Sequence, residues 1–143
     1  MILISHRGNV EGPNSTFENH PTRINDALGR GYDCEVDIRI IDNKIYLGHD
    51  EPTHLISIGW LHKRRDRLWI HCKDLKTFSK FNTFYRNFNY FFHDSDLGVL
   101  TSLSYIWSVN NVKNGILVMP ESFNTKPNKY TLGVCSDYIQ SYK

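Results

Sequence analysis

The chain has 143 residues, of which 40% are hydrophobic, and it carries 17 basic and 15 acidic side chains for a net charge of +2. A chain of this length is expected to form one domain, residues 1–143, around one hydrophobic core. The balanced charge argues against a nucleic-acid partner or an anionic membrane surface attracted by a long-range field.

The N-terminal segment predicts a strand, a loop and a helix. Residues 1–5 form a continuous apolar run that ends at His6, which is typical of a strand buried on both faces. The segment 9–16 is rich in Gly, Pro, Asn and Ser and is predicted to be a loop. Apolar residues then recur at helical spacing over about 21–30, before a pair of glycines.

A strand hairpin is predicted next. Residues 33–41 alternate between apolar and polar side chains, so Glu35 and Asp37 should project from the same face of a strand. Asp42-Asn43 is a hairpin-type turn, and the antiparallel strand after it ends at Gly48-His49-Asp50. The hairpin should therefore fold His49 back toward the two carboxylates.

The rest of the chain predicts two further strands with a helix between them and then a series of short strands. The predicted elements are a strand at 68–73, a helix at 75–85, a strand at 89–94 and short strands at 99–101, 105–107, 116–119 and 133–137. This order favours an α/β fold, a reduced TIM-barrel-like barrel with few helices in its C-terminal half. A full barrel of this kind takes about 250 residues, so the chain would hold a shrunken one.

Polar side chains at the ends of these strands suggest chemistry on a phosphate ester. The carboxyl ends of strands are where α/β sheets assemble active sites. Two imidazoles that exchange protons, His6 and His49, together with the carboxylate pair Glu35 and Asp37, suit metal-assisted acid/base catalysis.

The motifs His6-Arg7-Gly8, Glu18-Asn19, Glu35-Val36-Asp37 and Gly48-His49-Asp50 together resemble the glycerophosphodiester phosphodiesterase family, one of the phosphatidylinositol-specific phospholipase C-like phosphodiesterases. That resemblance implies a TIM barrel and a phosphoric diester hydrolase, of which this chain would be a shortened member. It also implies site residues: acid/base catalysis by His6 and His49, metal ligands Glu35 and Asp37, and phosphate binding by Arg7 and Lys73.

The sequence departs from the family pattern at His71, where the resemblance implies a third carboxylate ligand. Mg²⁺ or Ca²⁺ is the expected cofactor, and both prefer oxygen ligands. His71 as a ligand would weaken the metal site or shift it to a softer ion, unless Asp50, Asp94 or Glu121 supplements it. A non-catalytic module that binds a phosphate or sugar-phosphate ligand is the alternative function.

Other features have structural interpretations beside functional ones. The basic run 62–67, flanked by tryptophans, is interpreted as a solvated helix end rather than an RNA-binding patch. The aromatic residues of 78–92 should pack in the core, although any exposed ones would suit a homo-oligomer contact. His93 and Asp137 also end predicted strands, where turn or capping duty is expected.

The three cysteines, Cys34, Cys72 and Cys135, lie inside apolar strand-like segments. Their odd number and their positions predict buried free thiols in a reducing compartment. No segment approaches the roughly 20 apolar residues of a membrane span, and the apolar run before His6 is too short for a signal peptide. These features predict a cytoplasmic protein, and the family resemblance implies that it acts on a small-molecule phosphodiester.

Overall fold

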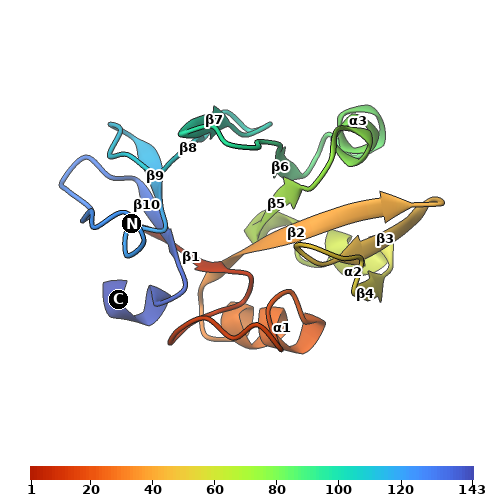
Figure 1. Cartoon of the computed structure of the whole chain (residues 1–143), viewed down its shortest axis with the longest axis horizontal. Coiled ribbons are helices and arrows are strands. Elements are labelled where there is room, and N and C mark those ends of the chain that lie inside the picture. The colour runs from red at the N-terminus through yellow and green to blue at the C-terminus, as the bar shows by residue number, and fades with distance from the viewer.

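A curled mixed sheet of ten strands forms the body of the protein in the computed structural model, which describes residues 1–143 (Figure 1). The strands are β1 (Ile2–His6), β2 (Asp33–Ile41), β3 (Lys44–Leu47), β4 (His54–Ile56), β5 (Leu68–Cys72), β6 (Asn89–Phe91), β7 (Gly98–Leu100), β8 (Ile106–Ser108), β9 (Gly115–Val118) and β10 (Gly133–Ser136). The helices are α1 (Pro21–Gly29), α2 (Ile58–His62) and α3 (Leu75–Phe84), with short 3₁₀ turns at Arg65–Arg67 and Ile139–Tyr142.

The expected reduced TIM-barrel-like fold is wrong. Parallel pairings join β6, β5, β2, β1, β10, β9 and β8 in that spatial order, but the curl stays open, because β6 pairs only with β5 and β7 pairs only with β8. Only two units, β1-α1-β2 and β5-α3-β6, have the strand–helix–strand order of such a barrel. Loops without α-helices connect β8, β9 and β10, so half of the curl has no outer helical layer (Figure 1).

Strand β2 organises the sheet because it pairs with three neighbours along its length. Its first residues pair with β1, its middle with β5, and its last residues with the antiparallel strand β3. The turn between β2 and β3 has φ of 49° at Asp42 and 60° at Asn43, the left-handed conformations that two-residue hairpin turns favour. The predicted hairpin is therefore confirmed.

The helices cover the outer face of the sheet only on the side of β1, β2 and β5. Ile24 of α1 and Phe81 of α3 are buried in a hydrophobic cluster with β2 and β5 side chains, and Ala27 of α1 is buried in a second cluster with Val134 of β10. Asp74 begins α3 by accepting a hydrogen bond from the Thr77 backbone N–H at 2.6 Å. None of the helices is long and apolar enough to cross a membrane.

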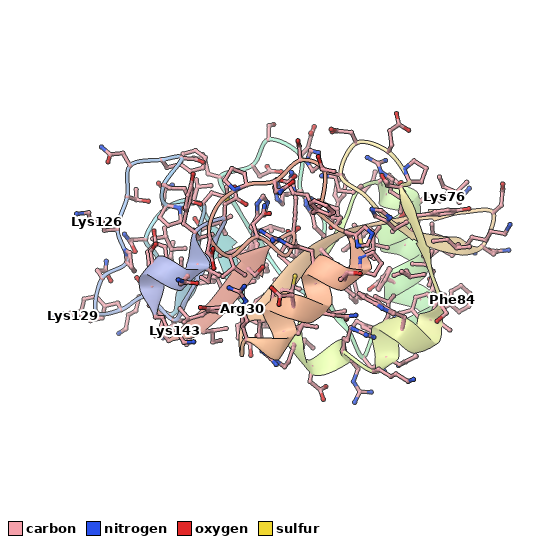
Figure 2. The ribbon with its side chains drawn as sticks, turned by 90° about the horizontal axis from the view of Figure 1, so that it is seen from below. Arg30, Lys76, Phe84, Lys126, Lys129 and Lys143 are labelled. Carbon is pink, nitrogen blue, oxygen red and sulfur yellow. The ribbon has the colours of Figure 1, made fainter.

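The hydrophobic residues fill both sides of the sheet, as the apolar pattern predicts. All three cysteines are buried and free, as expected. The aromatic residues of 78–92 are mostly core, with Phe81, Phe88 and Phe91 almost fully buried. Phe84 is the exception, being 66% exposed at the end of α3, where Figure 2 shows it on the periphery of the molecule.

Aromatic packing spans the opening of the curl, where no strand pairing does so. Trp107 of β8 stacks on Trp69 of β5, with ring centroids 5.6 Å apart, and contacts Phe91 of β6 at 4.8 Å. These rings form an apolar layer with Ile4, Ile116 and Cys135. Burial of such large side chains stabilises the open end of the sheet, and the Ser102 N–H of the β7–β8 turn adds one backbone hydrogen bond to the Tyr90 carbonyl oxygen of β6 at 2.8 Å.

Candidate active site

A polar layer lies directly above this apolar layer, at the carboxyl ends of the parallel strands. Side chains two residues apart on a strand share a face. Each polar residue therefore lies on the same face as an apolar residue of the layer below: His6 with Ile4, His71 with Trp69, and Asp137 with Cys135. The register of the strands brings the polar residues together: His6 is opposite Glu35, and Asp37 is opposite His71.

One cavity of about 970 Å³ opens over this polar layer. Both His6 and His49 line it, together with Arg7, Glu35 and Lys73. The β2–β3 hairpin therefore returns His49 to the cavity that Glu35 and His6 also line. The other wall of the cavity is largely apolar, with contributions from β6, β8 and the segment after β9.

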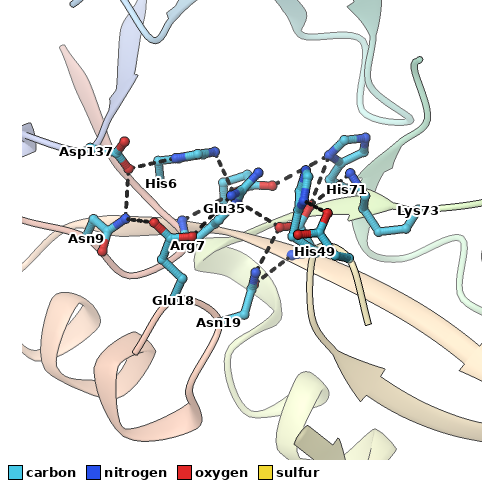
Figure 3. A network of polar contacts seen from close by, with 12 residues as sticks. His6, Arg7, Asn9, Glu18, Asn19, Glu35, His49, His71, Lys73 and Asp137 are labelled. Carbon is cyan, nitrogen blue, oxygen red and sulfur yellow. Dashed lines mark hydrogen bonds and ion pairs between the residues drawn. The ribbon is translucent and has the colours of Figure 1, made fainter. Parts of the chain in front are cut away.

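Glu35, Asp37 and His71 form the one cluster with metal-ligand geometry, since they offer ligand atoms that all lie within 4.8 Å of one another. His71 Nδ1 lies 3.2 Å from Asp37 Oδ1 and 3.9 Å from Glu35 Oε1. Asn19 holds Asp37 in place with two hydrogen bonds. Its Nδ2 donates to Asp37 Oδ2 at 2.8 Å, and its Oδ1 accepts from the Asp37 backbone N–H at 2.9 Å. Figure 3 shows these contacts.

The two buried carboxylates of this cluster have opposite pKa shifts. Burial, followed by the charge of Asp37, raises the pKa of Glu35. Burial also opposes ionisation of Asp37, but its contact with His71 and the charges of Arg7 and Lys73 hold its pKa well below the usual range. Positive charge is therefore concentrated around Asp37 and is scarcer around Glu35.

A cation fits this cluster. Asp37 Oδ1 is buried and accepts no hydrogen bond, even though the side chain is fully inaccessible to solvent. The positively charged or imidazole groups nearest to this oxygen are His71 Nδ1 at 3.2 Å and Lys73 Nζ at 3.5 Å, neither of which forms a hydrogen bond with it. A divalent cation against this oxygen would compensate its burial more fully. The residues present therefore suit a divalent ion held by two carboxylates and one imidazole.

Arg7 and Lys73 surround Asp37 on the cavity side. Arg7 Nε lies 3.0 Å from Asp37 Oδ2, and its Nη1 donates to Glu18 at 3.2 Å. Lys73 Nζ lies 3.5 Å from Asp37 Oδ1. The backbone of Arg7 has a left-handed φ of 53°, which bends the chain sharply at the end of β1 and is a strained conformation for a non-glycine residue. Both cations suit binding of a phosphate in the cavity.

His6 is held by a residue that the sequence analysis had assigned to structural duty. Its Nδ1 lies 2.8 Å from Asp137 Oδ1, which also accepts from Asn9 Nδ2 at 2.8 Å. Its Nε2 lies 3.8 Å from Glu35 Oε2. Although burial disfavours the charged ring, the hydrogen bond to Asp137 and the charge of Glu35 outweigh it and raise the pKa of His6. The position of Asp137 at the end of a predicted strand was the one indication in the sequence that it could belong to the site. Nothing in the sequence identified His6 as its partner.

His49 enters the cavity from the loop after β3. Its side chain is 40% exposed, and its Nδ1 lies 2.7 Å from Asp50 Oδ1. Gly48 permits this loop: its φ is 150°, and a Cβ there would lie 1.8 Å from the Glu51 carbonyl oxygen. The Arg39 guanidinium donates to the His49 carbonyl oxygen and also lines the cavity. The alternation predicted for residues 33–41 puts Arg39 on the same face as Glu35 and Asp37, but the sequence indicated no role for it.

The supplementary carboxylates proposed for the metal lie elsewhere. Asp50 pairs with His49, and Glu121 accepts hydrogen bonds from Ser136 and the Asp137 backbone, beneath the His6 contact. Asp94 lines the cavity but does not belong to the ligand cluster.

The basic run before β5 forms a helix end, where Arg64 lies over the Trp60 ring at 4.1 Å.

Comparisons of the chain with family models, with curated proteins and with solved structures found no match. The resemblance to the glycerophosphodiester phosphodiesterases therefore rests on the short motifs and their order.

Proposed function

We propose that the protein is a metal-dependent phosphodiester hydrolase in which His6 and His49 form the acid/base pair. The observation that carries this proposal is a single cavity lined by both imidazoles, by the cations Arg7 and Lys73, and by Glu35 of the ligand cluster. The motif order adds support, since it resembles that of the glycerophosphodiester phosphodiesterases. A small-molecule phosphodiester is the proposed substrate.

The residues of the site address the two obstacles to phosphodiester cleavage. Negative oxygens repel a nucleophile, and Arg7 and Lys73 would hold and neutralise them, because clamps of this kind supply much of the barrier lowering. A divalent ion bound by Glu35, Asp37 and His71 would add Lewis-acid neutralisation of the phosphate. The second obstacle is the poor alkoxide leaving group, which needs a proton.

We assign the proton donor to His6 and the proton acceptor to His49. His6 Nδ1 is bonded to Asp137, which leaves Nε2 to face the cavity and stabilises the imidazolium. His49 is more exposed, so it can accept a proton from an attacking hydroxyl and pass it to solvent. Each group should contribute on the order of 10²–10⁴-fold to the rate.

The test is hydrolysis of bis(p-nitrophenyl) phosphate by the full chain after chelation and after addition of each divalent ion. His6→Ala and His49→Ala should each lower turnover by about 10²–10⁴-fold. His62→Ala is the matched control, since this exposed histidine lies on α2 and does not line the cavity. Wild-type turnover in both cavity variants would overturn the acid/base assignment.

A non-catalytic phosphate-binding module is the second candidate. It is favoured by His71 at the position of an implied third carboxylate and by the charges of Arg7 and Lys73, which already neutralise Asp37. Such a module would bind inorganic phosphate but would leave every phosphodiester intact. If His71→Asp then created metal-dependent turnover that the parent lacks, the parent would be the binder.

A further inference from the structure

We propose that the Glu35–Asp37–His71 cluster selects a first-row transition-metal ion, such as Mn²⁺, Co²⁺ or Zn²⁺, over Mg²⁺ and Ca²⁺. The inference rests on the proposed function only in taking this cluster as the metal site. It replaces the expectation of Mg²⁺ or Ca²⁺ that the motif resemblance implied.

The hydrogen-bond environment of His71 favours the tautomer that a metal ligand needs. Its Nε2 lies 3.5 Å from the His93 carbonyl oxygen, to which an Nε2 proton donates. The proton at Nε2 leaves a lone pair on Nδ1, and Nδ1 is the atom that faces Asp37 and Glu35. Metal-binding histidines commonly have this arrangement, in which a carbonyl or carboxylate fixes the tautomer through the other ring nitrogen.

Stacking holds the His71 ring in this orientation. The Phe91 ring lies parallel to it, with centroids 5.1 Å apart and an interplanar angle of 11°. The His93 ring also stacks on it, at 4.5 Å and 7°. With its side chain only 11% exposed, His71 has little freedom to turn Nδ1 away from the carboxylates. A ligand fixed in advance binds without the cost of ordering it.

The donor set separates the two classes of ion. Mg²⁺ and Ca²⁺ are hard cations that take oxygen ligands, and a neutral imidazole offers them neither charge nor oxygen. First-row transition ions accept imidazole nitrogen and carboxylate oxygen together, with affinity rising from Mn²⁺ toward Zn²⁺ and Cu²⁺. One imidazole with two buried carboxylates is therefore a transition-metal donor set.

A competing interpretation needs no metal. A protonated His71 would form an ion pair with Asp37, at the same 3.2 Å between Nδ1 and Oδ1. In that case the nitrogen would carry a proton in place of a lone pair and could not coordinate an ion. Although Nδ1 lies only 3.2 Å from Asp37 Oδ1, the two atoms do not have hydrogen-bond geometry, and the ion-pair partner of this oxygen is Lys73 Nζ at 3.5 Å. An N–H on Nδ1 would therefore not be directed at the oxygen, which favours a lone pair on Nδ1.

The experiment measures metal affinity and ligand identity without an activity assay. Chelator-treated full-length protein is titrated with Mg²⁺, Mn²⁺ and Co²⁺ by calorimetry, and the Mn²⁺ form is examined by electron spin echo modulation for ¹⁴N coupling from a bound imidazole. Wild type should bind Mn²⁺ and Co²⁺ more tightly than Mg²⁺ and show the nitrogen signal. Since loss of even an outer hydrogen-bond partner costs 10–100-fold, His71→Gln should cost about 100-fold in Co²⁺ affinity.

Matched variants keep the result interpretable. His71→Glu should lose the ¹⁴N signal, and its affinity for Mg²⁺ should rise relative to its affinity for Mn²⁺. His62→Gln should bind metal as wild type does. Unchanged circular dichroism shows that each variant is folded. Tighter binding of Mg²⁺ by wild type, or nitrogen coupling that persists in folded His71→Glu, would overturn the inference. Transition-metal binding without phosphodiester turnover would instead refute the proposed function alone, and Mg²⁺-selective turnover would refute this inference alone.

Discussion

The contact between Asp137 and His6 makes the sharpest prediction for the site. Asp137→Asn removes a negative charge but keeps an oxygen that can accept from His6 Nδ1 and from Asn9 Nδ2. The geometry should persist while the imidazolium loses its partner. We therefore expect the pKa of His6 to fall in this variant, since Asp137 is one of the groups that raise it.

The magnitude follows from the type of hydrogen bond. A bond to a charged group contributes about 1.5–3 kcal/mol and a neutral one about 0.5–1.5 kcal/mol, a difference of about 1–1.5 kcal/mol. One pKa unit corresponds to about 1.36 kcal/mol, so the His6 midpoint should fall by about one unit. The two side chains are 15% and 11% exposed, so solvent screening reduces this value little.

The sign of the stability change is also fixed. Because the folded pKa of His6 is raised, its contribution is complete below the unfolded value of about 6.5 and is lost as pH rises through the folded pKa. The pKa of Asp137 is lowered, by its contacts with His6 and Asn9 against the effect of burial, so its contribution is present above about 3.9 and is lost as pH falls. Asp137→Asn should thus destabilise more near pH 5.5 than near pH 9.

The assay is NMR titration of the His6 ring in metal-free protein, alongside urea unfolding at both pH values. A His6 midpoint that is unchanged in Asp137→Asn would refute the reasoning. An equal loss of stability at both pH values would show that Asp137 acts through packing and not through charge.

Three further outcomes are expected. Gly48→Ala should cost at least about 1–3 kcal/mol in urea unfolding, because the added Cβ would meet the Glu51 carbonyl oxygen at a positive φ; Gly29→Ala, at an open position, is the control. Arg39→Gln should lower turnover more than substrate binding, since it releases the His49 carbonyl oxygen, and an equal loss in both would contradict this role. A divalent ion at 100 times its Kd should stabilise wild type by about 2.7 kcal/mol in thermal unfolding, and Glu35→Gln should lose most of that gain.

Local patterns in the sequence were sufficient to predict β1, α1 and the β2–β3 hairpin, but not β4 or α2. Alternation in β2 put Glu35 and Asp37 on one face, and the Asp42-Asn43 turn fixed the hairpin that returns His49. Both features depend on residues close in sequence, for which period and turn chemistry are reliable guides. Alternation along β5 likewise predicts that His71 and Lys73 share a face, but it is the pairing of β5 with β2 that brings them beside Asp37.

The open curl of the sheet and the residues that support the site could not be predicted in this way. Asp137 and His6 are separated by 131 residues and meet only because β10 pairs with β1. Nothing in the local pattern around Asp137 specifies that neighbour. Similarly, two strand–helix–strand units suggested a barrel, but the contacts of Trp107 with Trp69 and Phe91 span the opening without a further pairing. Long-range packing decides both features.

The charges around Asp37 link metal and phosphate binding. Without a divalent ion, Arg7 and Lys73 are the cations that neutralise this buried carboxylate, so both are drawn toward it and away from a ligand in the cavity. An ion at Asp37 Oδ1 would take over that neutralisation and free the two cations for a phosphate. Binding of the ion and of the phosphate should then be cooperative, and thermodynamic reciprocity requires each to strengthen the other by the same factor. Calorimetric titration of inorganic phosphate with and without Mn²⁺ measures this factor, and equal affinities would mean that Arg7 and Lys73 are not the phosphate ligands.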